Sequence, residues 1–219
     1  MTRSLTLATL ALMAPLALSA QAAGTPAPAP AATQATAVFA GGCFWGIEGL
    51  FEHVKGVISA TAGYAGGTRT QPSYEDVGSG ETGHAESVRV VYDPAQVTYR
   101  QLLEVFFLVG HDPTEFNRQG PDVGTQYRSI AFYADPAQHQ AISAYIAELS
   151  RAKQFHGPIV TQVTALKAFY DAEGYHQHYM ALHPDSPYIE YNDAPKLVAL
   201  KRQFPALYRE PGGVWAAAR

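Results

Sequence analysis

Hydrophobic and polar positions follow two periods along the chain, which predict short strands and amphipathic helices in turn. Apolar runs bounded by Gly, Pro or Asp mark the strands, and helical spacing with capping signals marks the helices. The predicted strands are residues 36–40, 57–64, 87–92, 127–133 and 158–165. The predicted helices are residues 43–56, 102–108 and 137–151. Thr98 and Gln101 form a capping box before the second helix, and Asp135-Pro136 supplies an N-cap and an N1 proline for the third. This order favours an α+β fold: a two-layer sandwich on a ferredoxin-like βαββαβ core, with an extra helix and strand and a loop-rich C-terminal segment.

The first residues carry the pattern of a secretory leader. Arg3 supplies a positive charge, residues 5–18 are apolar and uncharged, and residues 20–22 form a small-x-small cleavage site. An uncleaved membrane anchor is the alternative, but the apolar run is shorter than the roughly 20 residues that a span needs. We therefore expect export to the bacterial periplasm, with a Gram-positive or eukaryotic secretory route as the alternative. The expected segments are a signal peptide at 1–22, a Pro/Ala-rich linker at 23–35, a catalytic domain at 36–209 and a tail at 210–219.

Composition and charge exclude some kinds of metal site and argue against some kinds of partner. The 219 residues are 47% hydrophobic, carry a formal net charge of −4 and include one Cys. One thiol excludes an intramolecular disulfide and a multi-thiolate metal site. The slightly acidic balance argues against a nucleic-acid partner. His176, His178 and His183 raise the question of a metal, but helix positions i and i+2 do not share a face, so we expect no metal. We also expect a monomer.

Cys43 is the first candidate for chemistry. It stands where a strand, Gly41-Gly42 and a helix start meet, so the helical amides and macrodipole are expected to lower the pKa of its thiol. The alternative is a buried structural Cys, which is the commonest state of a lone thiol. Phe44 and Trp45 follow directly and offer an apolar slot for a small alkyl group, although Phe44 also fits an ordinary core position.

Glu86 is the second candidate. Period-2 counting places it on the apolar face of its strand, where desolvation is expected to raise its pKa and make it a neutral acid. The alternative is a strand-end carboxylate that points to solvent or pairs with an Arg. His84 lies on the same face and is expected to support the site as a substrate-binding residue. Tyr74, Asp122 and Tyr127 lie in loop-like segments, where functional residues concentrate.

Several motifs occur together in one order. They are GGCFWG at 41–46, GHAE at 83–86 and GTQYRS at 124–129, with PSY at 72–74, YDP at 92–94, HDP at 111–113 and YHQ at 175–177. In these motifs the chain, from about residue 38 to 204, resembles the A-type peptide methionine sulfoxide reductases. The resemblance implies that Cys43 is the nucleophile, that Glu86 donates a proton to the sulfoxide oxygen, and that the substrate is the S epimer.

The same resemblance implies further site roles. Tyr74 and Tyr127 would hydrogen-bond the sulfoxide oxygen. Phe44 and Trp45 would hold the substrate methyl group. Asp122 matches a loop acid assigned to the site and to its recycling.

The chain departs from the family pattern at the resolving cysteines. Ile189 and Gly78 stand where many family members carry a second thiol. We therefore expect no bound cofactor and an external thiol reductant: a thioredoxin-fold protein, a glutathione-type thiol, or dithiothreitol in vitro. Two rival interpretations remain, a Cys/His hydrolase and an exported peptide-binding module with an inert Cys.

Overall fold

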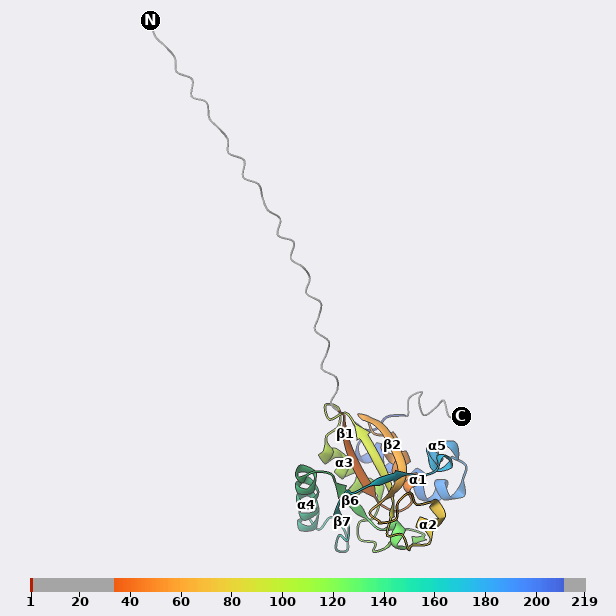
Figure 1. The fold of residues 1–219 in the computed structure, drawn as a ribbon. Helices are drawn as coiled ribbons and strands as arrows, with labels where there is room; N and C mark the ends of the chain where they lie inside the picture. The colour runs from red at the N-terminus through yellow and green to blue at the C-terminus, as the bar shows by residue number, and fades with distance from the viewer. Residues whose placement is uncertain (2–33, 211–219) are drawn as a thin grey trace. The chain divides into compact units, whose positions relative to one another are not determined.

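The fold combines one mixed sheet with helices, which confirms the α+β class (Figure 1). The computed structural model describes residue 1 and residues 34–210. The strands in this part of the chain are β1 (Ala35–Ala40), β2 (Val57–Ala65), β3 (Ala85–Tyr92), β4 (Arg118–Gln119), β5 (Asp122–Val123), β6 (Ile130–Tyr133), β7 (Gln162–Ala165) and β8 (Phe169–Asp171). The helices are α1 (Phe44–Glu52), α2 (Tyr74–Gly78), α3 (Tyr99–Val105), α4 (Pro136–Arg151), α5 (Tyr179–Leu182) and α6 (Ala194–Gln203).

The sheet orders its six described strands as β7-β6-β1-β3-β2-β8. Every neighbouring pair is antiparallel except β6 and β7, which run parallel. The central order β6-β1-β3-β2, with α1 and α3 as the connections between strands, is that of a βαββαβ unit. Strands β7 and β8 widen it at both edges. The sequence predicted only one of these edge strands, and β7 begins four residues later than expected.

Helices α1, α3 and α4 cover one face of the sheet and close the main core. From α1, Ile47, Leu50 and Phe51 are at most 1% exposed and pack with Phe39 of β1. Capping boxes or caps start the other two helices: the Thr98 side chain accepts from the Gln101 N–H, and Asp135 caps α4 before Pro136. Helix α1 has no side-chain cap, and its N-cap residue is Cys43.

Two π-helical turns extend helices of this core. Residues Phe106–Gly110 follow α3, and residues Ile189–Asp193 precede α6. π-Helical turns are rare and occur frequently at functional sites. The second turn brings the C-terminal segment toward the start of α1, as the contacts between them show.

The predicted domain boundaries stay predictions. All of the leader at 1–22 except residue 1, nearly all of the linker at 23–35 and the tail beyond residue 210 lie outside the described residues. Within residue 1 and residues 34–210, we find no helix that has both the length and the apolar character required to cross a membrane.

Candidate active site

Cys43 is the N-cap residue of α1, directly after β1 and the Gly41-Gly42 pair. Both glycines are needed for the close approach of other segments. A Cβ on Gly41 would lie 2.9 Å from the Phe106 ring, and Gly42 has a φ of +90° with Gln119 in the space of a side chain. The tight Gly-Gly turn therefore sets the Cys43 thiol at the start of the helix, where it is half-buried.

Glu86 lies on β3 with its carboxyl group turned toward the start of α1. Its side chain is 3% exposed, and its Oε2 accepts a hydrogen bond of 3.0 Å from the Phe44 backbone N–H. Burial raises the pKa of Glu86 to about 8, although the Phe44 hydrogen bond lowers it. Near neutral pH this group is mostly a neutral acid, as its place on the apolar face of β3 predicted.

The Cys43 thiol corrects one expectation. Burial raises its pKa well above the usual range, and the charges of Glu86 and Asp193 raise it further. The Trp45 backbone N–H lowers it, in the direction expected of a helix N-terminus, but with the smaller effect. The prediction of a lowered thiol pKa was wrong, because desolvation and neighbouring carboxylates outweigh the helix amides.

Three tyrosine hydroxyl groups are electrostatically coupled to Cys43. Burial is the main cause that raises the pKa of Tyr74, to about 12, and the pKa of Tyr127. The charges of Glu86 and Cys43 raise both pKa values further. The Tyr188 hydroxyl donates a hydrogen bond to Asp122, and burial, followed by the Cys43 charge and this hydrogen bond, raises the pKa of Tyr188. These residues come from α2, the turn before β6, β5 and the C-terminal segment, so the fold gathers them around Cys43.

Aromatic rings line this cluster. Phe44 is 1% exposed and packs against the rings of Tyr64, Tyr74 and His176. Trp45 is half-buried, stacks on Tyr179 with ring centroids 3.7 Å apart, and donates from Nε1 to His176 Nδ1 at 3.1 Å. Trp45 therefore presents the accessible apolar surface beside the thiol, while Phe44 lies beneath it.

His84 has a different role from the one predicted. Its side chain is 1% exposed, its Nδ1 accepts from the Gly67 N–H at 3.1 Å, and its Nε2 lies 2.7 Å from the Arg69 carbonyl. Both ring nitrogens hold the loop before α2. The expectation that His84 binds substrate is corrected, because no ring nitrogen is left for a ligand.

The comparisons identify the family. A family model described as peptide methionine sulfoxide reductase matches residues 35–207.

The chain belongs to the peptide methionine sulfoxide reductase family.

Curated relatives and solved structures agree. The chain is 56% identical over 175 residues to peptide methionine sulfoxide reductase MsrA 2 of Mesorhizobium japonicum, covering 80% of this chain and 90% of the relative. The MsrA 2 of Synechocystis is 51% identical, covering 77% and 78%. The reduced form of Mxr1 from Saccharomyces cerevisiae superposes with a TM-score of 0.64 at 35% identity, covering 70% of this chain and 87% of that one. Methionine sulfoxide reductase A of Corynebacterium diphtheriae gives 0.62 at 38% identity, covering 69% and 76%.

In this reductase the structure also brings in residues that the sequence did not single out. Glu173 accepts from the Tyr74 backbone N–H at 2.9 Å and from the Tyr64 hydroxyl at 2.8 Å, and so fixes Tyr74. Asp193 and Tyr188 in the C-terminal segment are electrostatically coupled to Cys43: the Asp193 charge raises the pKa of Cys43, after burial and Glu86, and the Cys43 charge raises the pKa of Tyr188, after burial. The only sequence signal for them was their place in an aromatic, His-rich region, which does not reveal that this region folds onto α1.

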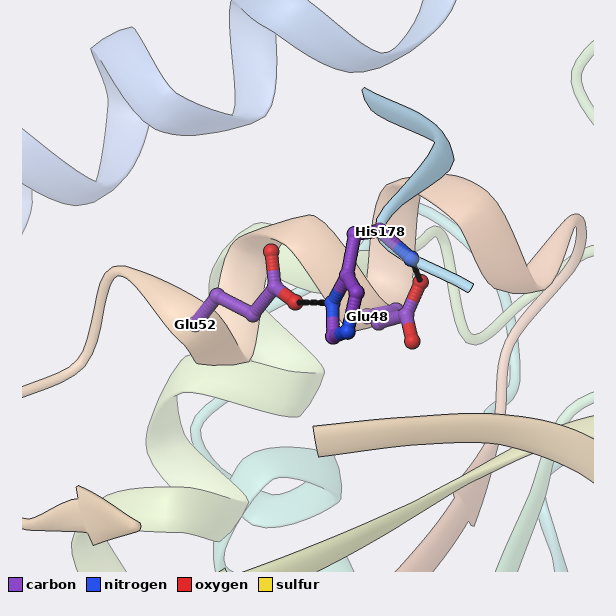
Figure 2. Close-up of side chains that lie close together, drawn as sticks. All are labelled: Glu48, Glu52 and His178. Atoms are coloured by element: carbon purple, nitrogen blue, oxygen red, sulfur yellow. Dashed lines mark hydrogen bonds and ion pairs between the residues drawn. The ribbon is translucent and has the colours of Figure 1, made fainter. Parts of the chain in front are cut away.

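A second cluster of acidic and imidazole groups lies farther along α1 of the reductase. Glu48 and Glu52 on this helix meet His178, with possible ligand atoms within 4.8 Å of one another (Figure 2). Glu48 accepts from the backbone N–H groups of Ala62 and His178, and His178 Nδ1 pairs with Glu52 at 2.6 Å. These bonds anchor the C-terminal segment to α1, so the cluster has a structural explanation without a metal.

Proposed function

We infer that this chain is a peptide-methionine (S)-S-oxide reductase that works through a sulfenic acid at Cys43. The observation that carries the mechanism is the hydrogen bond between the Phe44 N–H and Glu86. It holds a buried acid with a pKa of about 8 beside the residue that follows the nucleophile. A sulfoxide oxygen leaves sulfur only when it is protonated, so an acid at this position supplies what the thiol needs.

The reaction starts from protonated groups on both sides. The raised pKa values of Cys43 and Glu86 keep the thiol and the carboxylic acid neutral near pH 7. Glu86 gives its proton to the sulfoxide oxygen, the Cys43 sulfur attacks the substrate sulfur, and the thiol proton replaces the one that Glu86 gave. The oxygen ends on Cys43. The balance is sulfoxide plus thiol giving thioether plus sulfenic acid, so methionine is reduced and Cys43 is oxidised.

The arrangement also accounts for the choice of epimer. Trp45 offers an apolar surface for the methyl group, while Tyr74, Tyr127 and Glu86 offer donors for the oxygen. With these two substituents fixed against the attacking sulfur, the remaining carbon chain has one exit. The opposite epimer would place its oxygen against the aromatic surface, where no donor meets it.

Recycling needs a thiol from outside the chain, because the sequence contains one Cys. The incoming thiol attacks the Cys43 sulfenic acid, water leaves, and a mixed disulfide forms. A second thiol then releases Cys43. A thioredoxin-fold dithiol or a glutathione-type thiol serves this step, and dithiothreitol replaces it in vitro. Cys43 is only half-buried, so part of the residue is open to an incoming thiol.

We further propose that this reductase repairs exported proteins. The support is the leader-like pattern of residues 1–22: a basic start, an uncharged apolar run and a small-x-small site. Repair of methionine is useful in an oxidising compartment, where sulfoxides accumulate on exposed methionines.

A direct assay tests the activity. Separated S and R epimers of dabsyl-methionine sulfoxide are incubated with the protein and dithiothreitol, and with the Cys43→Ser variant as control. We expect reduction of the S epimer alone, and none by the variant. Cleavage of a peptide or ester without reductant would instead support the Cys/His hydrolase. If both activities are absent, the binding-module interpretation remains.

A further inference from the structure

Asp193 is a buried acid with one unsatisfied oxygen. Its side chain is 0% exposed, and its Oδ1 accepts a hydrogen bond of 2.6 Å from Lys196 Nζ. Among the described residues, no donor reaches its Oδ2. An acceptor that is buried without a partner costs free energy, on the order of 1–3 kcal/mol. Such a group calls for an explanation, and a place in an active site is one of the recurrent ones.

The carboxylate lies against the first turn of α1. A Cβ built on Gly46 would fall 2.0 Å from Asp193 Oδ1, so Gly46 leaves the space that the acid occupies. Cys43 is the N-cap residue of the same helix, directly before this turn and three residues before Gly46. The Asp193 charge is also one of the causes that raise the pKa of Cys43. The unsatisfied acid and the nucleophile are therefore close neighbours.

The reaction creates a donor at this place. The resting thiol is only a weak donor, whereas the sulfenic acid formed at Cys43 carries an O–H group. Resting on the proposed function, we propose that Asp193 Oδ2 accepts the hydrogen of the Cys43 sulfenic acid and positions that group for the incoming thiol. Asp193 is then a positioning residue for recycling, and its unsatisfied oxygen in the resting protein is the acceptor kept for the intermediate.

The charge of Asp193 supports the same role. A nearby anion disfavours loss of the sulfenic acid proton, so it keeps the intermediate in its neutral form. Neutral sulfenic acid is the form that a thiol reduces, with release of water. The sulfenate anion reacts with hydrogen peroxide, which adds a second oxygen, gives sulfinic acid and water, and ends activity. In a chain with one Cys the intermediate waits for an outside thiol, so this protection has a specific use.

Other titratable groups near Cys43 also affect the ionisation of its sulfenic acid. The acids are Glu86 on β3 and Asp122 on β5, and the hydroxyl groups are those of Tyr74, Tyr127 and Tyr188. Burial raises the pKa of Asp193 and the charge of Asp122 raises it further, whereas the Lys196 ammonium, 2.6 Å from Oδ1, lowers it and favours the charged form. Asp193 differs from all of these groups in combining full burial, a cation on one oxygen and no partner on the other.

The test separates formation of the intermediate from its fate. Wild type and Asp193→Asn are given one equivalent of the S epimer without reductant, and methionine is measured. Hydrogen peroxide is then added across a pH series, and sulfinic acid is followed by intact mass. We expect methionine from both proteins, and sulfinic acid forming about tenfold faster in the variant near pH 7. The midpoint of its pH profile should fall by about one unit, as expected for removal of a neighbouring charge.

Two further variants make the result decisive. Gly46→Ala keeps the charge of Asp193 but displaces the carboxylate, and Ala favours the helix, so it should also speed sulfinic acid formation. Glu52→Gln removes another buried acid from α1, one paired with His178, and should leave the rate and midpoint unchanged. If Asp193→Asn does not fold, Gly46→Ala decides. If a variant forms methionine but its rate of sulfinic acid formation and its pH midpoint equal those of the wild type, this inference is overturned and the proposed function stands. If the wild type forms no methionine, the proposed function is overturned, and this inference with it.

Discussion

The backbone N–H of Phe44 donates a hydrogen bond of 3.0 Å to the Glu86 carboxyl group, which ties the proton donor of β3 to the first turn of α1. Because Phe44 follows Cys43 directly, one bond fixes the acid relative to the nucleophile. Without this bond, only the packing around Glu86, which is 3% exposed on β3, would fix the position of its carboxyl group. The relative position of acid and thiol is therefore a property of the sheet–helix junction, not of a mobile loop.

We expect Glu86→Gln to slow the reductase step by about 10²–10⁴-fold, the usual cost of losing general acid catalysis. The amide keeps the shape and can still accept from the Phe44 N–H, so substrate binding should change little. Single-turnover rates and equilibrium binding of the S epimer measure the two effects separately. An unchanged rate would mean that Glu86 is a structural carboxylate.

The pH profile gives an independent check on Glu86. Since burial raises its pKa to about 8, the acid holds its proton below that pH and loses it above. The single-turnover rate of the wild type should fall as pH rises through about 8. A rate that keeps rising through this range would show that the Cys43 thiolate, and not the thiol–acid pair, starts the reaction.

The same group links folding to pH. A carboxyl group whose pKa is raised in the folded state binds more protons there than in the unfolded chain, so it lowers stability as pH rises from about 4.5 to about 8. Glu86→Gln removes this penalty, so its stability relative to the wild type should rise by about 4 kcal/mol between pH 5 and pH 9, at about 1.4 kcal/mol for each pKa unit of the shift. Urea titrations at pH 5 and pH 9 measure the change, and equal differences at both values would contradict it.

His84→Ala should damage stability and spare the chemistry. It removes both loop contacts of the ring and leaves the Gly67 N–H and the Arg69 carbonyl without it. A loss of about 1–3 kcal/mol in the free energy of unfolding is expected. The single-turnover rate of the folded fraction should stay near the wild-type value. A large loss of that rate with unchanged stability would return His84 to the substrate site.

Tyr74→Phe and Tyr127→Phe should each lower kcat/KM for the S epimer by about tenfold, the value of one hydrogen bond. Burial, and after it the charges of Glu86 and Cys43, raise the pKa of both hydroxyl groups, so both are near the groups that act on the sulfoxide oxygen. The double variant should lose more than either single one. If both single variants kept full kcat/KM, the oxygen would have to bind elsewhere.

The central fold could be predicted from the sequence because its signals are local. Apolar periodicity gave β1, β2, β3, β6 and the helices between them, and the Thr98 capping box and the Asp135 N-cap occur as expected. Strands β4, β5 and β8 have only two or three residues each. Such short strands exist through pairing with distant partners, which no local pattern records.

The site was predictable in its members and less so in its electrostatics. Cys43 and Glu86 carry signals of their own, a glycine turn before a helix and an acid on an apolar face. The direction of the Cys43 pKa depends on burial and on Asp193, which the C-terminal π-helical turn brings to α1. His84 shares the strand face of Glu86, but the loop before α2 covers it. Both misjudgements concern segments far apart in the chain.

The most direct test of the account is one turnover of the wild-type protein on the S epimer with no reductant present. Cys43→Ser, which should fold and form no methionine, is the control, because no other residue in the sequence can form a sulfenic acid. The account predicts one methionine per chain, followed by arrest, and an intact mass increased by about one oxygen that dimedone traps at Cys43. Continued turnover without a thiol, or a covalent dimer through Cys43 as the main product, would contradict it.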